Sequence, residues 1–520
     1  MSLAELFRQS RTRTPDKIAL ACGEKSWTYA ELDAISDDIA VHLVETGLER
    51  GDRIALHFAN SVELAFSYLG CLKAGCIAVP INTRLKYPEI DYILRHCGAA
   101  CYIGQPDLFA EAAKSQTRAP GLDRYFLTGS LPDFPQASPF DSLLGPFGGE
   151  ISLPGVGSEE IAAILYTSGT TARPKGVAHS HGTLAHTAEM MRQALLDENQ
   201  VVVITSSMAH MIGFGMLFLA ALLNGATVAI APASDPAAIL DTLERWRGTY
   251  MAGLPATVHS LVQMQLAEPR DVSSGRTYFC GGDSASPSLQ AAFLSVMGQP
   301  LYEMYGMTEI APITWNRPEG VRIGSVGQAD GGIRIRLLDQ EERDVPPGET
   351  GEICVQGPHF TAGYWQDPDG GAPAPGSGWF HTGDLARRDE DGYYWFAGRK
   401  KEVIIRGGSN ISPQEVEAAL CEHPAVAEAA VIGRRDPVWG ETVAACVVLL
   451  PGETVNETDL IAFAGERLAD YKAPERVFFL SELPKSPVGK IQRRVLRERE
   501  ASEGLEHRVA ASHSMVHNLV

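Results

Sequence analysis

Residues 166–177 read Tyr-Thr-Ser-Gly-Thr-Thr-Ala-Arg-Pro-Lys-Gly-Val and directly follow the apolar run 161–165. Glycine lets backbone N–H groups approach an anion closely, hydroxyl side chains donate further hydrogen bonds, and a lysine adds a positive charge. The stretch is not a Walker A loop, because Gly169 and Lys175 lie six positions apart and Gly176, not Ser or Thr, follows the lysine. The composition is that of a loop that cradles a polyphosphate; the alternative is an ordinary turn with one solvated lysine.

Four further segments also combine glycine with charged or hydroxyl-bearing residues. They are 305–309 (Tyr-Gly-Met-Thr-Glu), 379–384 (Trp-Phe-His-Thr-Gly-Asp), 398–410 (Gly-Arg-Lys-Lys-Glu-Val-Ile-Ile-Arg-Gly-Gly-Ser-Asn) and 484–490 (Pro-Lys-Ser-Pro-Val-Gly-Lys). Together with the first stretch, and in this order, they resemble the signature motifs of the adenylate-forming superfamily, which comprises acyl-CoA synthetases, non-ribosomal adenylation domains and luciferases. The resemblance extends over nearly the whole chain and favours the phosphate-loop interpretation.

Length and composition set the broad class of the protein. A chain of 520 residues is too long for one core and predicts about two to four domains. With 45% hydrophobic and 21% charged residues it has the composition of a soluble globular protein. The formal net charge of −20 argues against nucleic acid and anionic membranes as partners. An anionic substrate such as ATP must therefore be held by local positive groups and helix N-termini.

The cysteines and the N-terminus indicate the compartment. The nine cysteines contain no CxxC pair, and we interpret them as reduced, mostly buried thiols of a cytoplasmic protein. The first residues lack the basic region and long apolar core of a signal peptide.

One uncharged segment has two interpretations. Residues 201–234 contain no Asp, Glu, Lys or Arg, and 211–223 is almost wholly apolar, which a hydropathy window could read as a membrane span. Asn224-Gly225 interrupts the run, and 226–231 has the composition of a strand. We therefore expect a buried helix, a turn and a core strand, and no transmembrane segment.

The order of the predicted elements gives the fold class. Apolar β-branched runs alternate with helix-like segments, which predicts parallel sheets covered by helices. After about residue 320, short strands at 333–338 and 352–355 indicate a small β-rich subdomain. Beyond residue 401, a helix that starts at Ser412 with Glu415 in capping-box position opens a compact α+β domain. The fold class is α/β: a large N-terminal domain of helix-covered sheets plus a β-rich subdomain, and a small mobile α+β C-terminal domain. The predicted boundaries are 1–400, 401–500 and a flexible tail at 501–520.

The resemblance implies a two-step reaction. A carboxylate attacks the α-phosphate of ATP to give an acyl-adenylate and pyrophosphate, and a thiol then displaces AMP. Because the first step joins two anions, the site must supply positive charge and positioning. The groups implied to hold the β- and γ-phosphates are Thr167, Ser168, Gly169, Thr170, Thr171 and Lys175.

Four residues are implied to act at the reacting centre. Thr308 would donate to the α-phosphate, and Glu309 would ligate Mg²⁺, a cation that favours carboxylate and phosphate oxygens. Lys490 would bridge the substrate carboxylate and the α-phosphate as charge develops. His210 matches the position that gates thiol access at the mouth of the acyl pocket. The alternatives are a solvated carboxylate for Glu309, a surface lysine for Lys490 and a core histidine for His210.

Other motif residues are implied to bind the nucleoside and coenzyme A or to allow domain motion. Asp384 would accept from the ribose hydroxyls, because a carboxylate is an acceptor only, and Arg399 would contact the ribose or α-phosphate. Lys401 occupies the hinge position about which the C-terminal domain would rotate. The remaining members are Tyr305 with Gly306 against adenine, the turn Gly282, Asp283 and Ser284 beside the base, and Gly407 and Gly408 at the pantetheine tunnel.

The acyl pocket is implied to be small-residue rich and apolar, which suits an aliphatic or aryl carboxylate. An α-amino acid substrate is disfavoured because no acidic residue follows His210 before residue 235. Asp283 could still oppose a carboxylate or bind an amino group. The wall comprises His210, Ile212, Gly213, Phe214, Gly215, Gly281, Gly282, Met307, Ala311 and Pro312.

Departures from the family pattern are few. Ala172 replaces a glycine of the phosphate loop, Ser207 replaces a common proline, and Val488 stands where Thr or Ser is usual. None of them removes a charged catalytic group. We therefore expect an active, AMP-forming acyl-CoA synthetase that uses ATP, Mg²⁺ and coenzyme A. The alternatives are an adenylation enzyme that loads a carrier protein's phosphopantetheine, a catalytically inactive nucleotide-binding regulator and a luciferase-type oxygenase. The sequence leaves the acid and the oligomeric state open.

Overall fold

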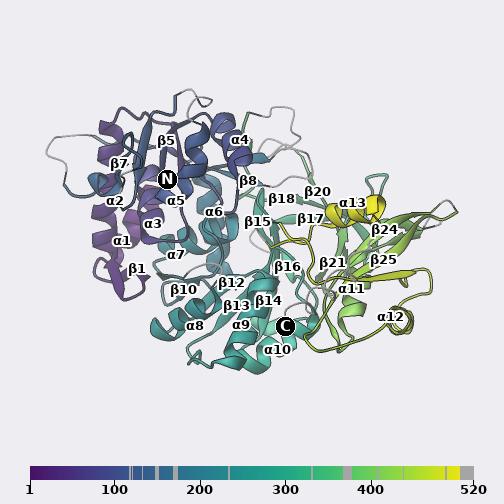
Figure 1. Ribbon diagram of the computed structural model, residues 1–520. Coiled ribbons are helices and arrows are strands. Elements are labelled where there is room, and N and C mark those ends of the chain that lie inside the picture. Colours follow the sequence, from purple (N-terminus) through teal and green to yellow (C-terminus); the bar gives the residue numbers. More distant parts are fainter. Residues whose placement is uncertain are drawn as a thin grey trace, which may run out of the picture. The chain divides into compact units, whose positions relative to one another are not determined.

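The computed structural model describes residues 1–115, 119, 121–129, 131, 133–146, 152–167, 174–231, 235–329, 332–366, 378–406, 409–436, 438–486 and 489–503. The chain forms two compact units (Figure 1). The N-terminal unit comprises Met1–Ala285, Leu289–Arg334 and Gln356–Phe380, and the C-terminal unit comprises Ser286–Ser288, Ile335–Val355 and His381–Val520. The β-rich segment predicted after residue 320 thus belongs largely with the C-terminal unit. The hinge at Lys401 concerns rotation of the C-terminal domain, not the division of the chain into compact units, and stays a prediction.

The N-terminal unit contains an eight-stranded sheet built largely from parallel strands. In spatial order its strands are β19 (Gly363–Tyr364), β9 (Lys175–Ser180), β8 (Ile161–Thr167), β4 (Ile77–Pro80), β3 (Arg53–His57), β5 (Ala99–Gly104), β6 (Arg124–Leu127) and β7 (Ser138–Pro139). The helices α3 (Val62–Lys73), α4 (Tyr87–Cys97) and α5 (Pro106–Ala112) connect successive parallel strands, as the alternation in the sequence predicts. Apolar side chains of α4, α5 and the sheet form one buried core.

A nine-stranded sheet forms the second layer of this unit. In spatial order its strands are β16 (Gln328–Ala329), β15 (Ile310–Trp315), β14 (Leu301–Met307), β13 (Thr277–Gly281), β12 (Tyr250–Gly253), β10 (Val201–Ile204), β11 (Thr227–Ile230), β1 (Ile18–Cys22) and β2 (Lys25–Thr28). The strands from β1 to β14 in this order are parallel, and β2, β15 and β16 are antiparallel. The helices α8 (Pro236–Arg245), α9 (Pro255–Ala267) and α10 (Pro287–Met297) pack their apolar faces against it.

Local sequence signals explain where several helices begin. The helices α1 (Leu3–Arg13) and α2 (Tyr29–Glu45) each start with a capping box, Ser2 with Glu5 and Thr28 with Glu31. The helix α6 (His181–Gln193) starts at Ser180, whose hydroxyl accepts the N–H of Thr183. Short 3₁₀ turns complete the unit: η1 (Ala113–Ser115), η2 (Phe140–Leu143) and η4 (Pro318–Gly320).

The uncharged segment folds as predicted into a buried helix, a turn and a core strand. Its helix consists of a π-helical part, η3 (Ile212–Leu219), followed by α7 (Ala220–Leu223), and its strand is β11. Within the described ranges, no helix has both the length and the apolar character needed to cross a membrane.

The C-terminal unit contains two smaller sheets. The first has four strands, β17 (Arg334–Leu338), β18 (Thr350–Gln356), β20 (Phe380–Arg388) and β21 (Tyr394–Arg399). The second has five, β23 (Ser409–Ile411), β22 (Ile404–Arg406), β25 (Gly440–Leu449), β24 (Val426–Asp436) and β26 (Arg476–Phe479), the last of which pairs with β25. Alternate residues of β24 enter two separate cores, one with α11 (Pro413–Cys421) and α12 (Glu457–Gly465) and one with α13 (Arg493–Glu503). The second sheet is therefore covered by helices on both faces, and α13 runs three residues into the segment predicted as a tail.

Candidate active site

The predicted phosphate loop joins two antiparallel neighbours, β8 and β9. Thr167, the last residue of β8, lies opposite Lys175, the first residue of β9. The predicted loop members Ser168, Gly169, Thr170 and Thr171 lie outside the described residues. The ammonium group of Lys175 lies over the ring of Tyr364 in β19, 4.4 Å from its centroid. A cation at this distance is attracted to the ring face, so Lys175 is held at the end of the loop.

The second predicted motif forms the turn between β14 and β15. Met307 pairs with Ile310 across this hairpin, which leaves Thr308 and Glu309 as its turn residues. The Glu309 carboxylate is buried, with only 7% of the residue exposed, and Oε1 accepts a 2.7 Å hydrogen bond from the Tyr364 hydroxyl. Tyr364 therefore contacts both Lys175 and Glu309. The fold brings together residues from two motifs that are more than a hundred positions apart.

Uncharged groups hold the backbone of the Thr308–Glu309 turn. The His179 ring, fully buried in β9, donates from Nε2 to the Thr308 carbonyl at 2.9 Å. Burial lowers the pKa of His179 to about 4, so the ring is neutral near pH 7. The Thr361 N–H donates to the Glu309 carbonyl at 2.7 Å. His179 is not among the residues predicted from the sequence; a histidine among the apolar residues that follow the phosphate loop was the available signal.

His210 lies just before the π-helix η3. Its Nε2 is 2.8 Å from Nδ2 of Asn82, a buried residue that follows β4. The Asn82 Oδ1 accepts the Arg84 N–H at 2.9 Å, which orients the Asn82 amide group toward His210. His210 Nε2 is thus an acceptor, and the ring proton resides on Nδ1. Asn82 is a second residue that the sequence analysis missed.

Close packing explains two of the predicted pocket glycines. A Cβ at Gly213 would lie 2.3 Å from the Ser207 carbonyl oxygen, so the start of η3 can approach the preceding loop only without a side chain. Gly282 has φ +82°, and a Cβ there would lie 2.7 Å from Leu254 and 3.6 Å from Ile212. Ile212 and Gly282, predicted as parts of one pocket wall, are therefore neighbours.

The remaining predicted pocket residues and the two residues predicted to lie against adenine, Tyr305 and Gly306, occupy different environments. Gly306 lies against Ala311, since a Cβ on Gly306 would meet it at 3.3 Å. Met307 is half-buried, and Tyr305 is 9% exposed. The Phe214 ring is fully buried and stacks on Tyr68 of α3, with centroids 4.3 Å apart. Phe214 thus packs into the core that supports η3.

The predicted turn beside the adenine base rests on a buried carboxylate. Asp283 and Ser284 are exposed, and the Asp283 side chain accepts the Ser284 N–H at 3.0 Å. Glu303, 3% exposed in β14, accepts the Ala285 N–H at 2.9 Å and a Gln290 side-chain N–H at 2.9 Å. Burial raises the pKa of Glu303 to about 7. Glu303 is another supporting residue outside the set predicted from the sequence.

In the C-terminal unit, the two predicted nucleoside-binding residues face each other. Asp384 of β20 pairs directly with Arg399 of β21, and their side chains lie 3.6 Å apart. Next to them, the buried Glu352 accepts a 2.8 Å hydrogen bond from Lys400. Burial raises the pKa of Glu352, but hydrogen bonds from Lys400 and His381 outweigh it and hold the pKa below its usual range. This region is therefore fixed by ion pairs.

The predicted catalytic lysine closes a tight loop. Ser486 and Lys490 exchange backbone contacts: the Ser486 N–H donates to the Lys490 carbonyl at 2.7 Å, and the Lys490 N–H donates to the Ser486 hydroxyl at 3.2 Å. Lys490 is half-buried, and Lys401 is exposed in a turn after β21. The predicted tunnel residues Gly407 and Gly408 lie outside the described residues.

Comparison with known proteins identifies the family. Residues 7–365 match the family model for AMP-binding enzymes, and residues 415–490 match that for the AMP-binding enzyme C-terminal domain. The chain belongs to the AMP-binding enzyme family. It is an AMP-forming acid–thiol ligase of the acyl-CoA synthetase class.

Relatives of this AMP-binding enzyme differ in their acids and acceptors. Feruloyl-CoA synthase of an Amycolatopsis species is 35% identical over 494 residues, which cover 94% of this chain and 96% of the relative. A fatty acid–acyl-carrier-protein ligase of Streptomyces coeruleorubidus is 33% identical, with coverage of 93% and 94%. The crystal structure of the anthranilate CoA ligase AuaEII with anthranoyl-AMP matches with a TM-score of 0.88 at 28% identity, covering 96% of this chain and 97% of AuaEII.

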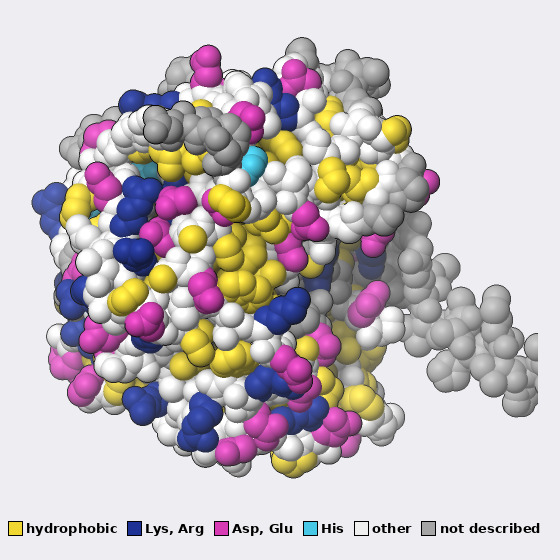
Figure 2. All heavy atoms as spheres, turned by 90° about the vertical axis from the view of Figure 1, so that its left-hand side faces the viewer, with side chains coloured by type: hydrophobic (Ala, Val, Ile, Leu, Met, Phe, Trp, Pro, Cys, Tyr) yellow, Lys and Arg dark blue, Asp and Glu magenta, His cyan; other side chains and the backbone are white. Residues whose placement is uncertain are grey.

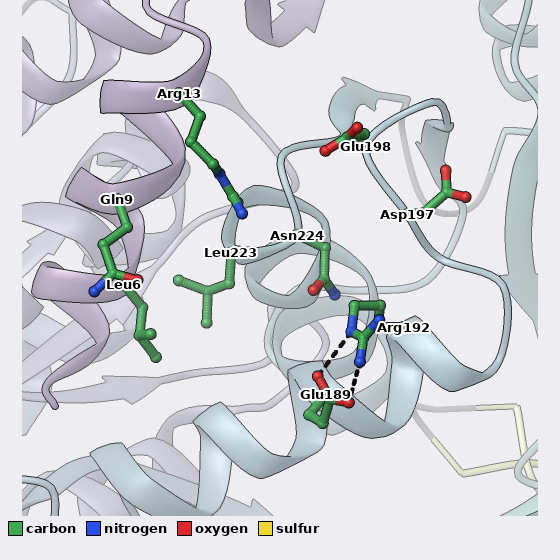
Figure 3. A pocket seen from close by; sticks show the side chains of 9 residues that line it. All are labelled: Leu6, Gln9, Arg13, Glu189, Arg192, Asp197, Glu198, Leu223 and Asn224. Atoms are coloured by element: carbon green, nitrogen blue, oxygen red, sulfur yellow. Dashed lines mark hydrogen bonds and ion pairs between the residues drawn. The ribbon is translucent and has the colours of Figure 1, made fainter.

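A cavity of about 550 Å³ lies elsewhere in the N-terminal unit of this enzyme (Figure 3). In Figure 3, Glu189 and Arg192 of α6 pair with each other on its wall, at distances of 2.5 and 2.8 Å. The lining residues are Leu6, Gln9, Arg13, Glu189, Arg192, Asp197, Glu198, Leu223 and Asn224. None of them belongs to the predicted site, so this cavity is separate from it.

Two further observations bear on cofactors and partners. Among the described residues, no group of three or more His, Cys, Asp and Glu side chains is arranged to hold a metal ion. On the face shown in Figure 2, acidic and basic side chains of the described residues are interspersed.

Proposed function

We propose that this ligase activates a medium-sized aliphatic or aromatic carboxylic acid with Mg-ATP and transfers the acyl group to coenzyme A. The acid attacks the α-phosphate, pyrophosphate leaves, and the CoA thiol then displaces AMP from the acyl-adenylate. The observation that carries this proposal is that Lys175 and Glu309 both contact the side chain of one residue, Tyr364. A lysine at the end of a phosphate loop and a buried carboxylate in the same place suit a nucleoside triphosphate with its cation.

Glu309 fits a magnesium ligand chemically. Its Oε1 is occupied by the Tyr364 hydroxyl, whereas its Oε2 accepts no hydrogen bond from the part of the chain that the structure describes. Mg²⁺ favours one or two carboxylate oxygens together with phosphate oxygens and would supply positive charge to the triphosphate. Lys175 and the hydroxyl of Thr308 would add a point charge and a hydrogen bond to the same phosphates.

The C-terminal unit would complete the first step. Asp384 would accept from the ribose hydroxyls, with Arg399 beside it for the ribose or α-phosphate. Lys490 would neutralise charge that develops between the carboxylate and the α-phosphate. Rotation about Lys401 would then exchange the Lys490 loop for the face that carries Gly407 and Gly408, so that one pocket serves both reactions.

The surroundings of Ile212 support an apolar acid. The Ile212, Leu254 and Gly282 neighbourhood offers aliphatic surface. No charged residue follows Val201 before Asp235, so the 201–234 part of the wall supplies no carboxylate for an α-amino group. Asp283, exposed next to Gly282, could still oppose a carboxylate or bind an amino group. His210, with its Nε2 held by Asn82, would gate the entry of the thiol.

A carrier protein is the second candidate acceptor. The specific observation in its favour is the relative that is a fatty acid–acyl-carrier-protein ligase. A phosphopantetheine arm carries the same thiol in both acceptors, so the adenylation site would be unchanged.

All nine cysteines are free thiols, which fits the reducing cytoplasm that we propose as the compartment.

The test is release of pyrophosphate and AMP from a panel of carboxylic acids, each with ATP and Mg²⁺ and with CoA, a phosphopantetheinylated carrier protein or no acceptor. We expect AMP turnover that requires both one class of apolar acid and CoA. AMP turnover with the carrier alone would favour the second candidate. No turnover with any apolar acid would contradict the proposed substrate class.

A further inference from the structure

Tyr364 occupies a fixed place beside β9, the strand that begins with Lys175. It lies in the short strand β19, where it pairs with Val177, and its neighbour Gly363 pairs with Ala178. Backbone hydrogen bonds on both sides, from Ala362 to Ala178 and from Trp365 to Gly176, hold this strand against β9 at 2.9 and 2.7 Å. The ring of Tyr364 is therefore anchored to the strand that leaves the loop.

The two ends of the Tyr364 side chain serve opposite charges. Its ring face, which carries partial negative charge, lies under the Lys175 ammonium group at 4.4 Å. Its hydroxyl donates its single proton to Glu309 Oε1 at 2.7 Å. The tyrosine brings no formal charge of its own to either contact. A cation in place of the Tyr364 hydroxyl would instead compete with an incoming metal ion for Glu309.

We propose that Tyr364 is a positioning residue of the adenylation step, which aims the Glu309 carboxylate at the nucleotide-bound cation and holds Lys175 beside the phosphates. This role rests on the proposed function. The two parts of the side chain act separately. The hydroxyl orients Glu309 toward the cation, and the ring holds Lys175 near the phosphates.

Two substitutions separate these tasks. Tyr364→Phe keeps the ring and removes the hydroxyl, so we expect the Mg²⁺ concentration for half-maximal effect to rise about tenfold, the order of effect of a lost hydrogen bond to a charged group. Tyr364→Leu also removes the aromatic face, so affinity for metal-free ATP should fall about threefold in addition. Tyr125→Phe is the matched control, because it removes a 2.6 Å hydrogen bond to the Leu122 carbonyl elsewhere in the same unit.

The experiment measures equilibrium binding of a fluorescent ATP analogue over a range of Mg²⁺ concentrations and in EDTA, so that no turnover is needed. We expect Tyr364→Phe to shift only the Mg²⁺ dependence, Tyr364→Leu to weaken both, and Tyr125→Phe to change neither. In the Glu309→Gln background, Tyr364→Phe should have no further effect on Mg²⁺ dependence, because the hydroxyl acts through that carboxylate.

The outcomes distinguish this role from the proposed function. If wild-type protein binds the analogue with Mg²⁺ and Tyr364→Phe shows the same Mg²⁺ dependence, the role of Tyr364 is overturned and the proposed function stands. If wild-type protein binds no analogue in either condition, the proposed function fails, and the role of Tyr364 fails with it.

Discussion

The two units support their motif residues in different ways. In the N-terminal unit, the Thr308–Glu309 turn is held by neutral groups: the His179 ring, the Thr361 N–H and the Tyr364 hydroxyl. In the C-terminal unit, ion pairs hold the segments in place instead. For example, Arg493 forms ion pairs with Glu402 at 3.0 Å and with Glu417 at 2.7 Å. The supports of the N-terminal turn bring no formal charge to it, whereas the ion pairs of the C-terminal unit use charges to join elements of the chain.

Arg493 illustrates the second kind of support. It stands at the start of α13, Glu417 lies in α11, and Glu402 follows the predicted hinge residue Lys401. The Arg493 and Glu417 side chains are only 11% and 12% exposed. One guanidinium group therefore ties together three segments of the C-terminal unit, including the helix that follows the Lys490 loop.

Replacement of Lys490 is expected to have the largest effect. Lys490→Ala should slow pyrophosphate release about a thousandfold, as loss of a group that stabilises transition-state charge does. It should spare thioester formation from supplied acyl-AMP. The measurement compares the two half-reactions in wild-type and variant protein, with Lys485→Ala in the same loop as the control. Equal losses in both half-reactions would contradict the role assigned to Lys490.

Removal of Arg493 is expected to loosen the C-terminal unit alone. Arg493→Met removes the cationic partner of Glu402 and of the largely buried Glu417, which should cost about 3 kcal/mol of local stability. Hydrogen exchange measured by mass spectrometry should report faster exchange in α11 and α13 and no change in β8 and β9. Arg494→Met is the matched control, because Arg494 is 83% exposed and pairs only at the surface with Glu498. Unchanged hydrogen exchange in α11 and α13 would show that Arg493 does not hold these helices together.

A proline at the predicted hinge should affect the second half-reaction. Lys401→Pro fixes φ at an exposed turn position and should slow thioester formation from supplied acyl-AMP about a hundredfold, while pyrophosphate release persists. Lys401→Ala, which removes the side chain without restricting the backbone, is the control. An unimpaired thioester step in the proline variant would exclude a hinge at this position.

The sequence predicted the layout of the fold better than the supports of the site. The alternation of apolar β-branched runs with helix-like segments predicted parallel sheets covered by helices, because burial dictates local composition. The π-helical winding of η3 was not predicted, because π-helices are rare and an apolar run looks the same in an α-helix. Local patterns carry little information of that kind.

The residues that hold the site in place, such as His179 and Tyr364, were not predicted for a related reason. Lys175, Thr308 and Glu309 stand in motifs that resemble those of a known family. Their partners lie far away in sequence: His179 is 129 positions from Thr308, and Tyr364 is 55 positions from Glu309. A lone histidine or tyrosine in an apolar strand looks like an ordinary core residue until the sheet brings it to the turn.

The smallest predicted effect concerns the neutral state of His179. Burial holds its pKa at about 4 in the folded protein, below the ordinary value of 6.5, so the unfolded chain binds more protons between these pH values. The contribution of His179 to stability is thus complete above about pH 6.5 and is lost as the pH falls toward 4. Between pH 7 and pH 5 this loss amounts to about 2 kcal/mol.

His179→Gln keeps an N–H for the Thr308 carbonyl but cannot titrate. The unfolding free energy of this variant, measured in urea, should therefore fall by about 2 kcal/mol less than that of wild type between pH 7 and pH 5. Because the raised pKa of Glu303 is common to both proteins, its opposite pH trend cancels in the difference. Parallel pH profiles would show that the support beneath Thr308 can carry a charge, and the contrast between neutral and ionic supports would then lose its clearest case.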